Sequence, residues 1–322
     1  MASFKIAFSD GAKEYNPVSG RIISVLNDIQ AASESSFEDA DLLIYSDFGH
    51  QHWAFKGLKI YVTGENMLPD FNQCDLAFSP HEDLADQRCI RLPYYAQLLP
   101  LRQSLVRSKN WDPEGLLNRP RFCSFIASNA RGPIRNAFFK KLNRVKKVDS
   151  AGRHFNNWGA PIENKLKFLE NYRFNIAFEN SSSPGYITEK LIDPLISGCI
   201  PVYWGAPDVN KDFNEDCMIN VSNFSDFQEA IEYILEVNND ATLRLKHLTA
   251  YPFHNNKEPE CINEEYIINP VLRLIHSDAK PSPRKYRKRQ LREHTFSSSA
   301  HQSLISLRCR IEGAMWRLGW KL

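Results

Sequence analysis

The sequence predicts a two-domain α/β protein made of two tandem Rossmann-like domains, on three observations. The chain has 322 residues, which is enough for about two domains with cores of their own. Short apolar runs alternate with amphipathic stretches along most of it, as in parallel sheets whose strands are joined by helices. A polar stretch with two prolines, "LVRSKNWDPEGLLNRPR" at 105–121, interrupts this alternation and indicates an interdomain linker.

The first series of elements occupies the N-terminal third of the chain. Apolar runs that are closed by polar or turn residues predict buried strands, and apolar residues at helical spacing predict a helix. The expected strands cover 4–9, 41–46, 58–66, 74–79 and 89–95, and the expected helix covers 20–32.

A second series of the same kind follows the linker. Its expected strands cover 122–128, 147–152, 173–179 and 199–205, and its expected helices cover 132–145, 163–172, 186–198 and 224–237. The predicted organisation is therefore an N-terminal domain (1–110), a linker (111–120), a C-terminal domain (121–278) and a tail (279–322). In open parallel sheets ligands bind beyond the carboxyl ends of the strands, so we expect the chemistry in those loops.

Composition is that of a soluble globular protein, with 43% hydrophobic and 24% charged residues. The net charge of +2 is uneven, because residues 280–322 hold eleven Lys and Arg against two Glu and leave −7 on the rest. Seven dispersed cysteines without a CxxC pair predict reduced thiols. The N-terminus does not read as a signal peptide and no 18-residue apolar run occurs, so we expect a cytosolic protein without a spanning anchor.

The loop "FENSSSPGYITEK" at 178–190 concentrates chemistry in an otherwise apolar neighbourhood. It joins an expected strand to an expected helix, whose N-terminus would offer unpaired N–H groups to an anion. If that helix begins at Tyr186, Lys190 projects from the same face one turn later, an arrangement that suits a diphosphate. The alternative is a capped helix whose charged residues, Glu179 and Glu189 among them, are solvated.

The wider string "FNIAFENSSSPGYITEKLIDPLISGCIPVYWGAP" (174–207) resembles the donor-binding signature of the α1,3/α1,4-fucosyltransferases. The resemblance continues in "SFIASNARGPIRNAFF" (124–139), "YVTGENMLPDFNQCDLAFS" (61–79) and "RLPYY" (91–95), in the family's order. It is greatest to the bacterial enzymes of lipopolysaccharide and Lewis antigen synthesis. It implies two Rossmann-like domains in the GT-B arrangement with a cleft between them, GDP-β-L-fucose as donor, and inversion at the anomeric carbon without a metal or other cofactor.

The resemblance also implies roles for particular residues. Glu65 in "TGEN" matches the family's proposed general base, the alternative being a turn carboxylate. Arg135 matches the arginine on the diphosphate and Lys190 the second phosphate cation. Glu189 would accept hydrogen bonds from ribose or fucose hydroxyls and help to stabilise the reacting centre, whereas Glu179 would orient the loop. The further donor contacts would be Asn180, Tyr186, Ser128 and Asn129.

The implied activity is transfer of L-fucose to the 3-OH of GlcNAc in N-acetyllactosamine-type glycans, as in O-antigen and Lewis X synthesis or other glycosylation. The same fold with an α1,4 linkage or a glucose acceptor is the first alternative. A catalytically silent glycan- or nucleotide-binding protein is the second, and the intact set Glu65, Arg135, Glu189 and Lys190 argues against it.

Two weaker patterns lie in the N-terminal domain. "DAD" at 39–41 has the spacing of a metal-binding motif of other glycosyltransferases, but it opens an expected strand and is interpreted as a turn. The nine histidines form no zinc-binding motif. His50, His52 and Trp53 in "FGHQHW" would either contact the acceptor sugar or belong to a solvated loop.

The tail combines two membrane-binding signals. Residues 280–292 contain seven Lys and Arg, and 301–322 has an apolar stripe flanked by arginines and by Trp316 and Trp320. A basic amphipathic helix of this kind binds anionic lipid, so we expect peripheral attachment to the cytoplasmic face of the membrane. Docking of this helix on the body or on a second copy is the alternative. Nucleic acid is not expected, since no recognition fold accompanies the basic run.

Overall fold

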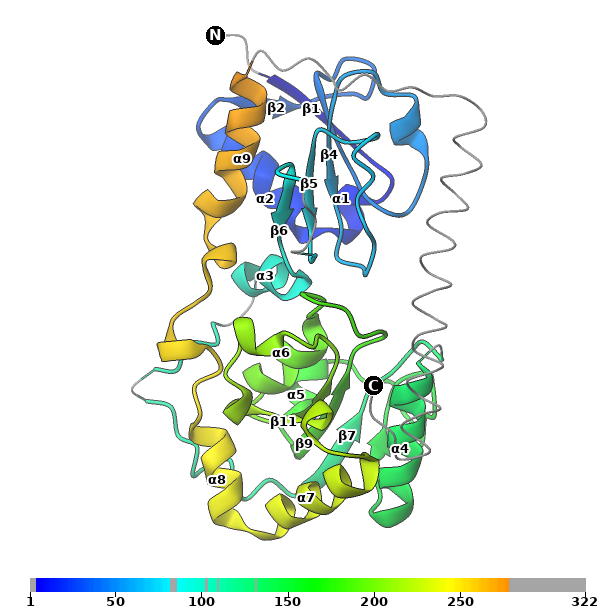
Figure 1. Ribbon diagram of the computed structural model, residues 1–322, viewed down its shortest axis with the longest axis vertical. Helices are drawn as coiled ribbons and strands as arrows, with labels where there is room; N and C mark the ends of the chain where they lie inside the picture. The colour runs from blue at the N-terminus through cyan, green and yellow to red at the C-terminus, as the bar shows by residue number, and fades with distance from the viewer. Residues whose placement is uncertain (1–3, 82–85, 102–103, 109, 131, 278–322) are drawn as a thin grey trace. The chain divides into compact units, whose positions relative to one another are not determined.

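The computed structural model describes residues 4–81, 86–101, 104–108, 110–130 and 132–277 (Figure 1). These residues divide into two compact units, each built around one parallel sheet. The predicted α/β class with two Rossmann-like units is therefore confirmed. The predicted tail, 279–322, lies outside the described residues.

Unit 1 contains the described residues up to 101 together with 184–186 and 259–277. Its sheet has the strand order β2-β1-β3-β4-β5-β6, and every neighbouring pair is parallel. The strands are β1 (Phe4–Ser9), β2 (Ala32–Glu34), β3 (Leu42–Tyr45), β4 (Leu58–Val62), β5 (Leu76–Ser79) and β6 (Cys89–Arg91), and the α-helices are α1 (Ala12–Tyr15), α2 (Pro17–Asp28), α3 (Tyr94–Leu98) and α9 (Glu264–His276).

Unit 2 contains the described residues of 104–183 and 187–258. Its sheet has the order β11-β10-β9-β7-β8, again with parallel neighbours only. The strands are β7 (Arg121–Phe125), β8 (Asp149–Ser150), β9 (Tyr172–Phe178), β10 (Ile200–Trp204) and β11 (Ile219–Asn220), and the α-helices are α4 (Pro133–Val145), α5 (Lys165–Leu169), α6 (Glu189–Ile196), α7 (Phe227–Asn239) and α8 (Ala241–Thr249).

The central strands are apolar on both faces because helices cover both sides of a parallel sheet. Every residue of β3, β4 and β10 is buried. In unit 2 the apolar face of α4 completes the core, where Phe138 lies 4.7 Å from Phe178 and 5.1 Å from Phe227 between ring centroids.

The helix expected at 20–32 is displaced in the structure. Asn16 caps α2 by accepting the N–H of Val18, and Pro17 occupies the first helical position, where its missing N–H costs nothing. The helix therefore begins three residues earlier than predicted and ends at Asp28. Part of the expected C-terminal turn belongs instead to the short edge strand β2.

The helix expected at 186–198 begins three residues later than predicted. Thr188 has extended backbone angles, and its side chain accepts the N–H of Lys190, so α6 starts at Glu189. Gly185 adopts a φ of +74° in the preceding loop, a conformation that favours glycine. The prediction that Tyr186 and Lys190 share one helical face is therefore wrong.

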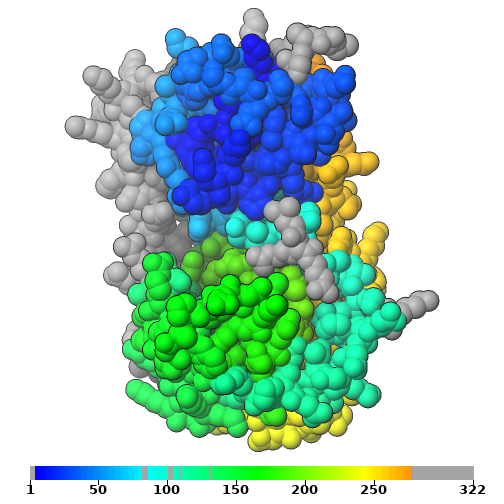
Figure 2. Space-filling model, turned by 180° about the vertical axis from the view of Figure 1, so that it is seen from behind, coloured from blue at the N-terminus to red at the C-terminus, as the bar shows by residue number. Residues whose placement is uncertain are grey.

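The structure also differs from the predicted domain boundaries. Residues 264–276, which the sequence analysis placed in the C-terminal domain 121–278, form helix α9, which belongs to unit 1 and packs against α2 and β5. Figures 1 and 2 both show the orange α9 beside the blue N-terminal elements. The guanidinium of Arg21 on α2 donates to the carbonyl of Ile262 (3.4 Å), just before α9. Burial of the apolar face of α9 (Ile267, Ile268, Val271 and Ile275) explains why the chain returns to unit 1.

Within the described ranges, no helix is both long enough and apolar enough to cross a membrane.

Candidate active site

Three carboxylates of unit 1 follow neighbouring parallel strands. Asp10 comes directly after β1, Asp47 follows β3, and Glu65 follows β4. Because the carboxyl ends of parallel strands meet at one edge of a sheet, these side chains lie where ligand-binding loops of such sheets are found.

Asp10 holds the loop after β3 rather than facing solvent. Its carboxylate accepts the backbone N–H groups of Gln51 (2.8 Å) and His52 (3.0 Å), and it contacts Nδ1 of His52 at 2.5 Å. Burial opposes ionisation of Asp10, but these hydrogen bonds outweigh it and lower the pKa to about 2. The expectation that His52 touches an acceptor sugar, or lies in a solvated loop, is wrong: its ring is buried and stacked on Tyr45 at 4.1 Å.

His50 and Trp53 stack on each other near the same loop, with ring centroids 4.3 Å apart. His50 is exposed and Trp53 half-buried, so this pair is the part of the expected acceptor surface that a ligand can reach. The "DAD" motif forms a turn before β3, as predicted, with Asp41 accepting the N–H of Lys5 (3.0 Å).

Asp47 lies against the adjoining strand β4. Its carboxylate accepts the hydroxyl hydrogens of Tyr61 and of Thr63, the latter at 2.5 Å. Burial raises the pKa of Asp47 to about 6; the two hydroxyl hydrogen bonds oppose this shift, and the negative charge of Glu65 adds to it.

Glu65, the predicted base, is exposed at the end of β4. Its backbone N–H donates to the hydroxyl oxygen of Thr63 at 3.0 Å, and its carbonyl accepts the N–H of Met67 at 2.8 Å. A tight turn therefore presents the carboxylate to solvent, where it could accept a proton from a bound substrate.

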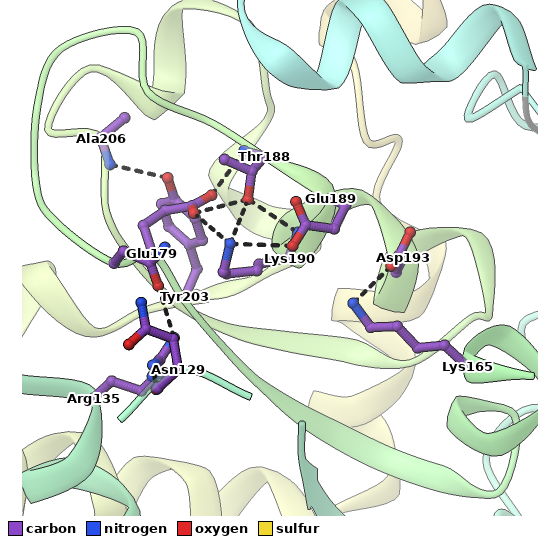
Figure 3. Close-up of polar contacts among 11 residues, drawn as sticks. Asn129, Arg135, Lys165, Glu179, Thr188, Glu189, Lys190, Asp193, Tyr203 and Ala206 are labelled. Atoms are coloured by element: carbon purple, nitrogen blue, oxygen red, sulfur yellow. Dashed lines mark hydrogen bonds and ion pairs between the residues drawn. The ribbon is translucent and has the colours of Figure 1, made fainter. Parts of the chain in front are cut away.

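In unit 2 the loop after β9 is organised by Glu179 (Figure 3). This carboxylate is 1% exposed and accepts both the N–H (2.7 Å) and the hydroxyl hydrogen (2.8 Å) of Thr188. Gly205 makes room for it, since a Cβ there would lie 2.5 Å from Cγ of Glu179. Burial raises the pKa of Glu179 despite the nearby ammonium of Lys190. The orienting role expected for Glu179 agrees with these contacts.

Lys190 lies between two carboxylates at the start of α6. Its Nζ is 3.1 Å from Glu189, 3.4 Å from Glu179 and 3.1 Å from the hydroxyl of Thr188. Burial favours its neutral form, but the two carboxylates dominate and raise its pKa. Burial likewise opposes ionisation of Glu189, yet Lys190 and Lys165 lower the pKa of Glu189 to about 2. Lys190 and Glu189 are therefore both charged at neutral pH.

Arg135 supplies a second cation at the same strand ends. It comes from α4, is 3% exposed, and donates to the side-chain oxygen of Asn180 (3.0 Å) and to the carbonyl of Asn129 (2.6 Å). The positive charge of Arg135 lowers the pKa of Lys190, but the two carboxylates outweigh this effect. Arg135 thus contacts Asn129 and Asn180 directly and interacts electrostatically with Lys190.

Ser128 and Tyr186 are the other two predicted donor contacts. Ser128 is exposed and lines a pocket of about 570 Å³ beyond β7 and β8, together with Arg153, Asn156 and Lys165. Gly152 shapes this pocket, because a Cβ there would lie 2.1 Å from the carbonyl oxygen of Ala127. Tyr186 is buried in the loop before α6, at 2% exposure.

Three residues of these sites escaped the sequence analysis: Asp10, Asp47 and Thr188. Each is a polar residue within two positions after a strand or directly before a helix, so position alone could have identified it. No group of three or more His, Cys, Asp or Glu side chains within the described ranges is arranged to hold a metal ion.

Two parallel α/β units with cations and carboxylates at their strand ends suit the binding of an anionic ligand, and comparison with known families identifies the class as glycosyltransferases. Two family models match the chain: "Glycosyltransferase family 10 (fucosyltransferase) C-term" over 117–274 and "Alpha-(1,3)-fucosyltransferase FucT N-terminal domain" over 6–98. The protein belongs to this fucosyltransferase family.

Individual relatives agree with that assignment. The chain is 37% identical to the alpha-(1,3)-fucosyltransferase FucT of Helicobacter pylori over 207 residues, which are 55% of this chain and 43% of that protein. It is 32% identical to alpha-(1,3)-fucosyltransferase B of Drosophila melanogaster over 170 residues, 48% of this chain and 37% of that protein. The chain thus spans less than half the length of these relatives.

Among solved structures, an alpha1,3-fucosyltransferase with GDP-fucose superposes with a TM-score of 0.71 and 28% identity, over 88% of this chain and 95% of that one. A further crystal structure of alpha1,3-fucosyltransferase gives a TM-score of 0.73 at 28% identity, over 89% and 95%. The GT-B fold class that the resemblance implied is confirmed by these matches.

Proposed function

We propose that the protein is an inverting α1,3-fucosyltransferase that moves L-fucose from GDP-β-L-fucose to the 3-OH of GlcNAc in N-acetyllactosamine-type glycans. The observation that carries the proposal is the cluster of Arg135 and Lys190 with Glu179 and Glu189 beyond β9, in a chain matched by both models of the family.

In this reaction the bond between the fucose C1 and the phosphate oxygen breaks, and its electron pair leaves with GDP. The acceptor oxygen forms the new bond to C1 while its proton passes to Glu65. One positioned base and stabilisation of the leaving diphosphate are what a single displacement requires. Glu65 is an exposed carboxylate that a substrate hydroxyl can reach, and Arg135 offers a fixed guanidinium to phosphate oxygens.

The contacts of Lys190 refine its proposed role. Its Nζ has three hydrogens and faces three oxygen partners, from Thr188, Glu179 and Glu189. A direct bond to phosphate would require it to leave one of them, so Lys190 acts first by neutralising two carboxylates that would otherwise repel the donor. Glu189, fully ionised beside it, is suited to accept hydrogen bonds from sugar hydroxyls.

The proposal includes independence from a metal, since Arg135 and Lys190 supply the positive charge. The test incubates purified protein with GDP-fucose, N-acetyllactosamine and EDTA, and identifies the linkage of the product. A 3-linked trisaccharide formed at an undiminished rate is expected; loss of transfer with EDTA that Mn²⁺ restores would refute metal independence. Parallel acceptors with a free 4-OH on GlcNAc, or with glucose, decide between the alternatives. Binding of GDP-fucose without transfer to any acceptor would indicate the silent protein instead.

A second part of the proposal concerns location. The segment 280–322 is basic and carries an apolar stripe, which suits attachment to an anionic membrane on the cytoplasmic side, beside lipid-linked acceptors. Deleting 280–322 should release the protein from anionic liposomes and leave its activity on soluble oligosaccharides intact. Continued liposome binding by the truncated form would contradict this part.

A further inference from the structure

The carboxylate of Asp47 is placed behind the turn that carries Glu65. Strands β3 and β4 are parallel neighbours with Tyr45 paired to Tyr61, so the residues that follow them emerge side by side. Asp47 lies two residues beyond β3, and Thr63 is the first residue beyond β4.

A directed chain of hydrogen bonds connects these residues. The hydroxyl of Thr63, which is fully buried, donates its only hydrogen to Asp47 at 2.5 Å. Its oxygen is then left as an acceptor, and the N–H of Glu65 donates to it at 3.0 Å. Since one hydroxyl cannot donate in two directions, the acceptor on Asp47 determines which way the Thr63 hydroxyl points, and hence what holds the backbone of Glu65.

The other contacts of Asp47 keep it in place. The buried phenol of Tyr61 donates to its second oxygen, and burial raises the pKa of Tyr61 so that the phenol keeps its hydrogen. A side-chain amide of Gln97 donates to the carbonyl of Thr63 at 2.8 Å and fixes the backbone there. These hydrogen bonds therefore hold the Asp47 carboxylate in place, whereas the Glu65 side chain is exposed and is positioned through its backbone.

Charge links the two carboxylates as well. The negative charge of Glu65 adds to the rise in the pKa of Asp47, so the two carboxylates interact electrostatically as well as through Thr63.

We propose that Asp47 is a positioning residue for Glu65, holding the turn of the base through the Thr63 hydroxyl. This inference rests on the proposed function, in which Glu65 removes the acceptor proton. Asp47 itself does not touch the substrate, so its effect must vanish when the Glu65 carboxylate is absent.

The experiment compares Asp47→Asn, Thr63→Val and Thr63→Ser in the full chain, with the exposed Asp28→Asn as a matched control. Asp47→Asn and Thr63→Val should lower kcat by roughly 10-fold to 10²-fold with the KM for GDP-fucose within about twofold, because misplacing a catalytic group costs this much. Thr63→Ser, which keeps the hydroxyl, should recover most of the loss seen in Thr63→Val.

A double-mutant cycle makes the test specific. Adding Asp47→Asn to Glu65→Gln should lower kcat no further, since the two act as one unit. The inference would be overturned if the kcat losses of Asp47→Asn and Glu65→Gln multiplied in the double variant. It would also be overturned if kcat were unchanged in Asp47→Asn and Thr63→Val. Both results leave the proposed function standing, provided that the wild type transfers fucose. Loss of activity in step with a lowered melting temperature would show a merely structural role. Absence of transfer by the wild type itself would overturn both.

Discussion

Replacing Lys190 by methionine should destabilise unit 2 in a way that depends on pH. The substitution keeps most of the side-chain volume but removes the cation that faces Glu179 at 3.4 Å and Glu189 at 3.1 Å. The Glu179 side chain has no exposed surface, so its charge would remain buried without a partner.

The magnitude is bounded by the chemistry of Glu179. A buried carboxylate without its cation can take up a proton, and at pH 7 this costs about 3 kcal/mol for a group whose ordinary pKa is 4.5. Because protonation is always available, the loss of stability through Glu179 cannot exceed that value. We expect about 2–3 kcal/mol at pH 7, since Thr188 still donates two hydrogen bonds to the carboxylate.

The pH dependence has a definite sign. In the variant, the folded-state pKa of Glu179 rises further above 4.5, so the penalty is largest at neutral pH and shrinks as the pH falls through that raised pKa towards 4.5. In the wild type, Lys190 and Lys165 lower the pKa of Glu189 to about 2, and removal of Lys190 raises this pKa again. The stabilisation that Lys190 gives to ionised Glu189 is likewise lost when the pH falls below the folded-state pKa of Glu189. The difference between wild type and variant should therefore narrow from pH 7.5 to pH 5.

Urea denaturation at both pH values measures the effect, with the exposed Lys167→Met as the control. Glu179→Gln added to Lys190→Met should restore much of the stability, since an amide oxygen can still accept from Thr188. An equal penalty at both pH values, or no recovery in the double variant, would refute the reasoning.

Further expectations concern single residues. Glu65→Gln should lower kcat by roughly 10²–10⁴ with unchanged affinity for GDP-fucose by calorimetry, and near-normal turnover would reassign the base. Arg135→Ala should weaken GDP-fucose binding as well as kcat, because a guanidinium meets the diphosphate before the reaction; unchanged affinity would exclude that contact. Asp10→Asn should destabilise unit 1 at neutral pH and not at pH 2. The pKa of Asp10 is lowered to about 2, so the stabilisation from its ionised form is fully present above about pH 4 and is lost as the pH falls through about 2. Denaturation curves at both pH values check this. Gly205→Ala should lower both stability and activity by displacing Glu179, and wild-type values for both would contradict the close approach.

Most of the fold could be predicted from apolar periodicity. The strands at 4–9, 41–46 and 199–205 were recognisable as mainly apolar runs, because buried parallel strands carry little polar sequence. Helix ends were less accurate, since α2 and α6 begin at caps provided by Asn16 and Thr188 rather than where apolar periodicity begins. The return of α9 to unit 1 depends on long-range packing that no local pattern contains.

Only part of the candidate site could likewise be predicted from the sequence. The motif residues Arg135, Asn180 and Lys190 could be named because a resemblance singled them out, and they do cluster. The pairing of Lys190 with Glu179, and the chain from Asp47 to Glu65, could not, because both join residues brought together only by strand adjacency or by the cap of α6. The prediction that His52 contacts the acceptor or is solvated was wrong for a related reason, because its buried partner Asp10 is 42 positions away in the sequence.

The position of α9 determines the order in which the protein can be completed during synthesis. Unit 1 is discontinuous, and a ribosome adding about 5–20 residues per second reaches Glu264–His276 only after all of 187–258 has been made. Unit 2 can therefore finish folding first, while α2 still lacks its packing partner α9. A nascent chain stalled before residue 264 would leave the face of α2 that α9 covers exposed to solvent.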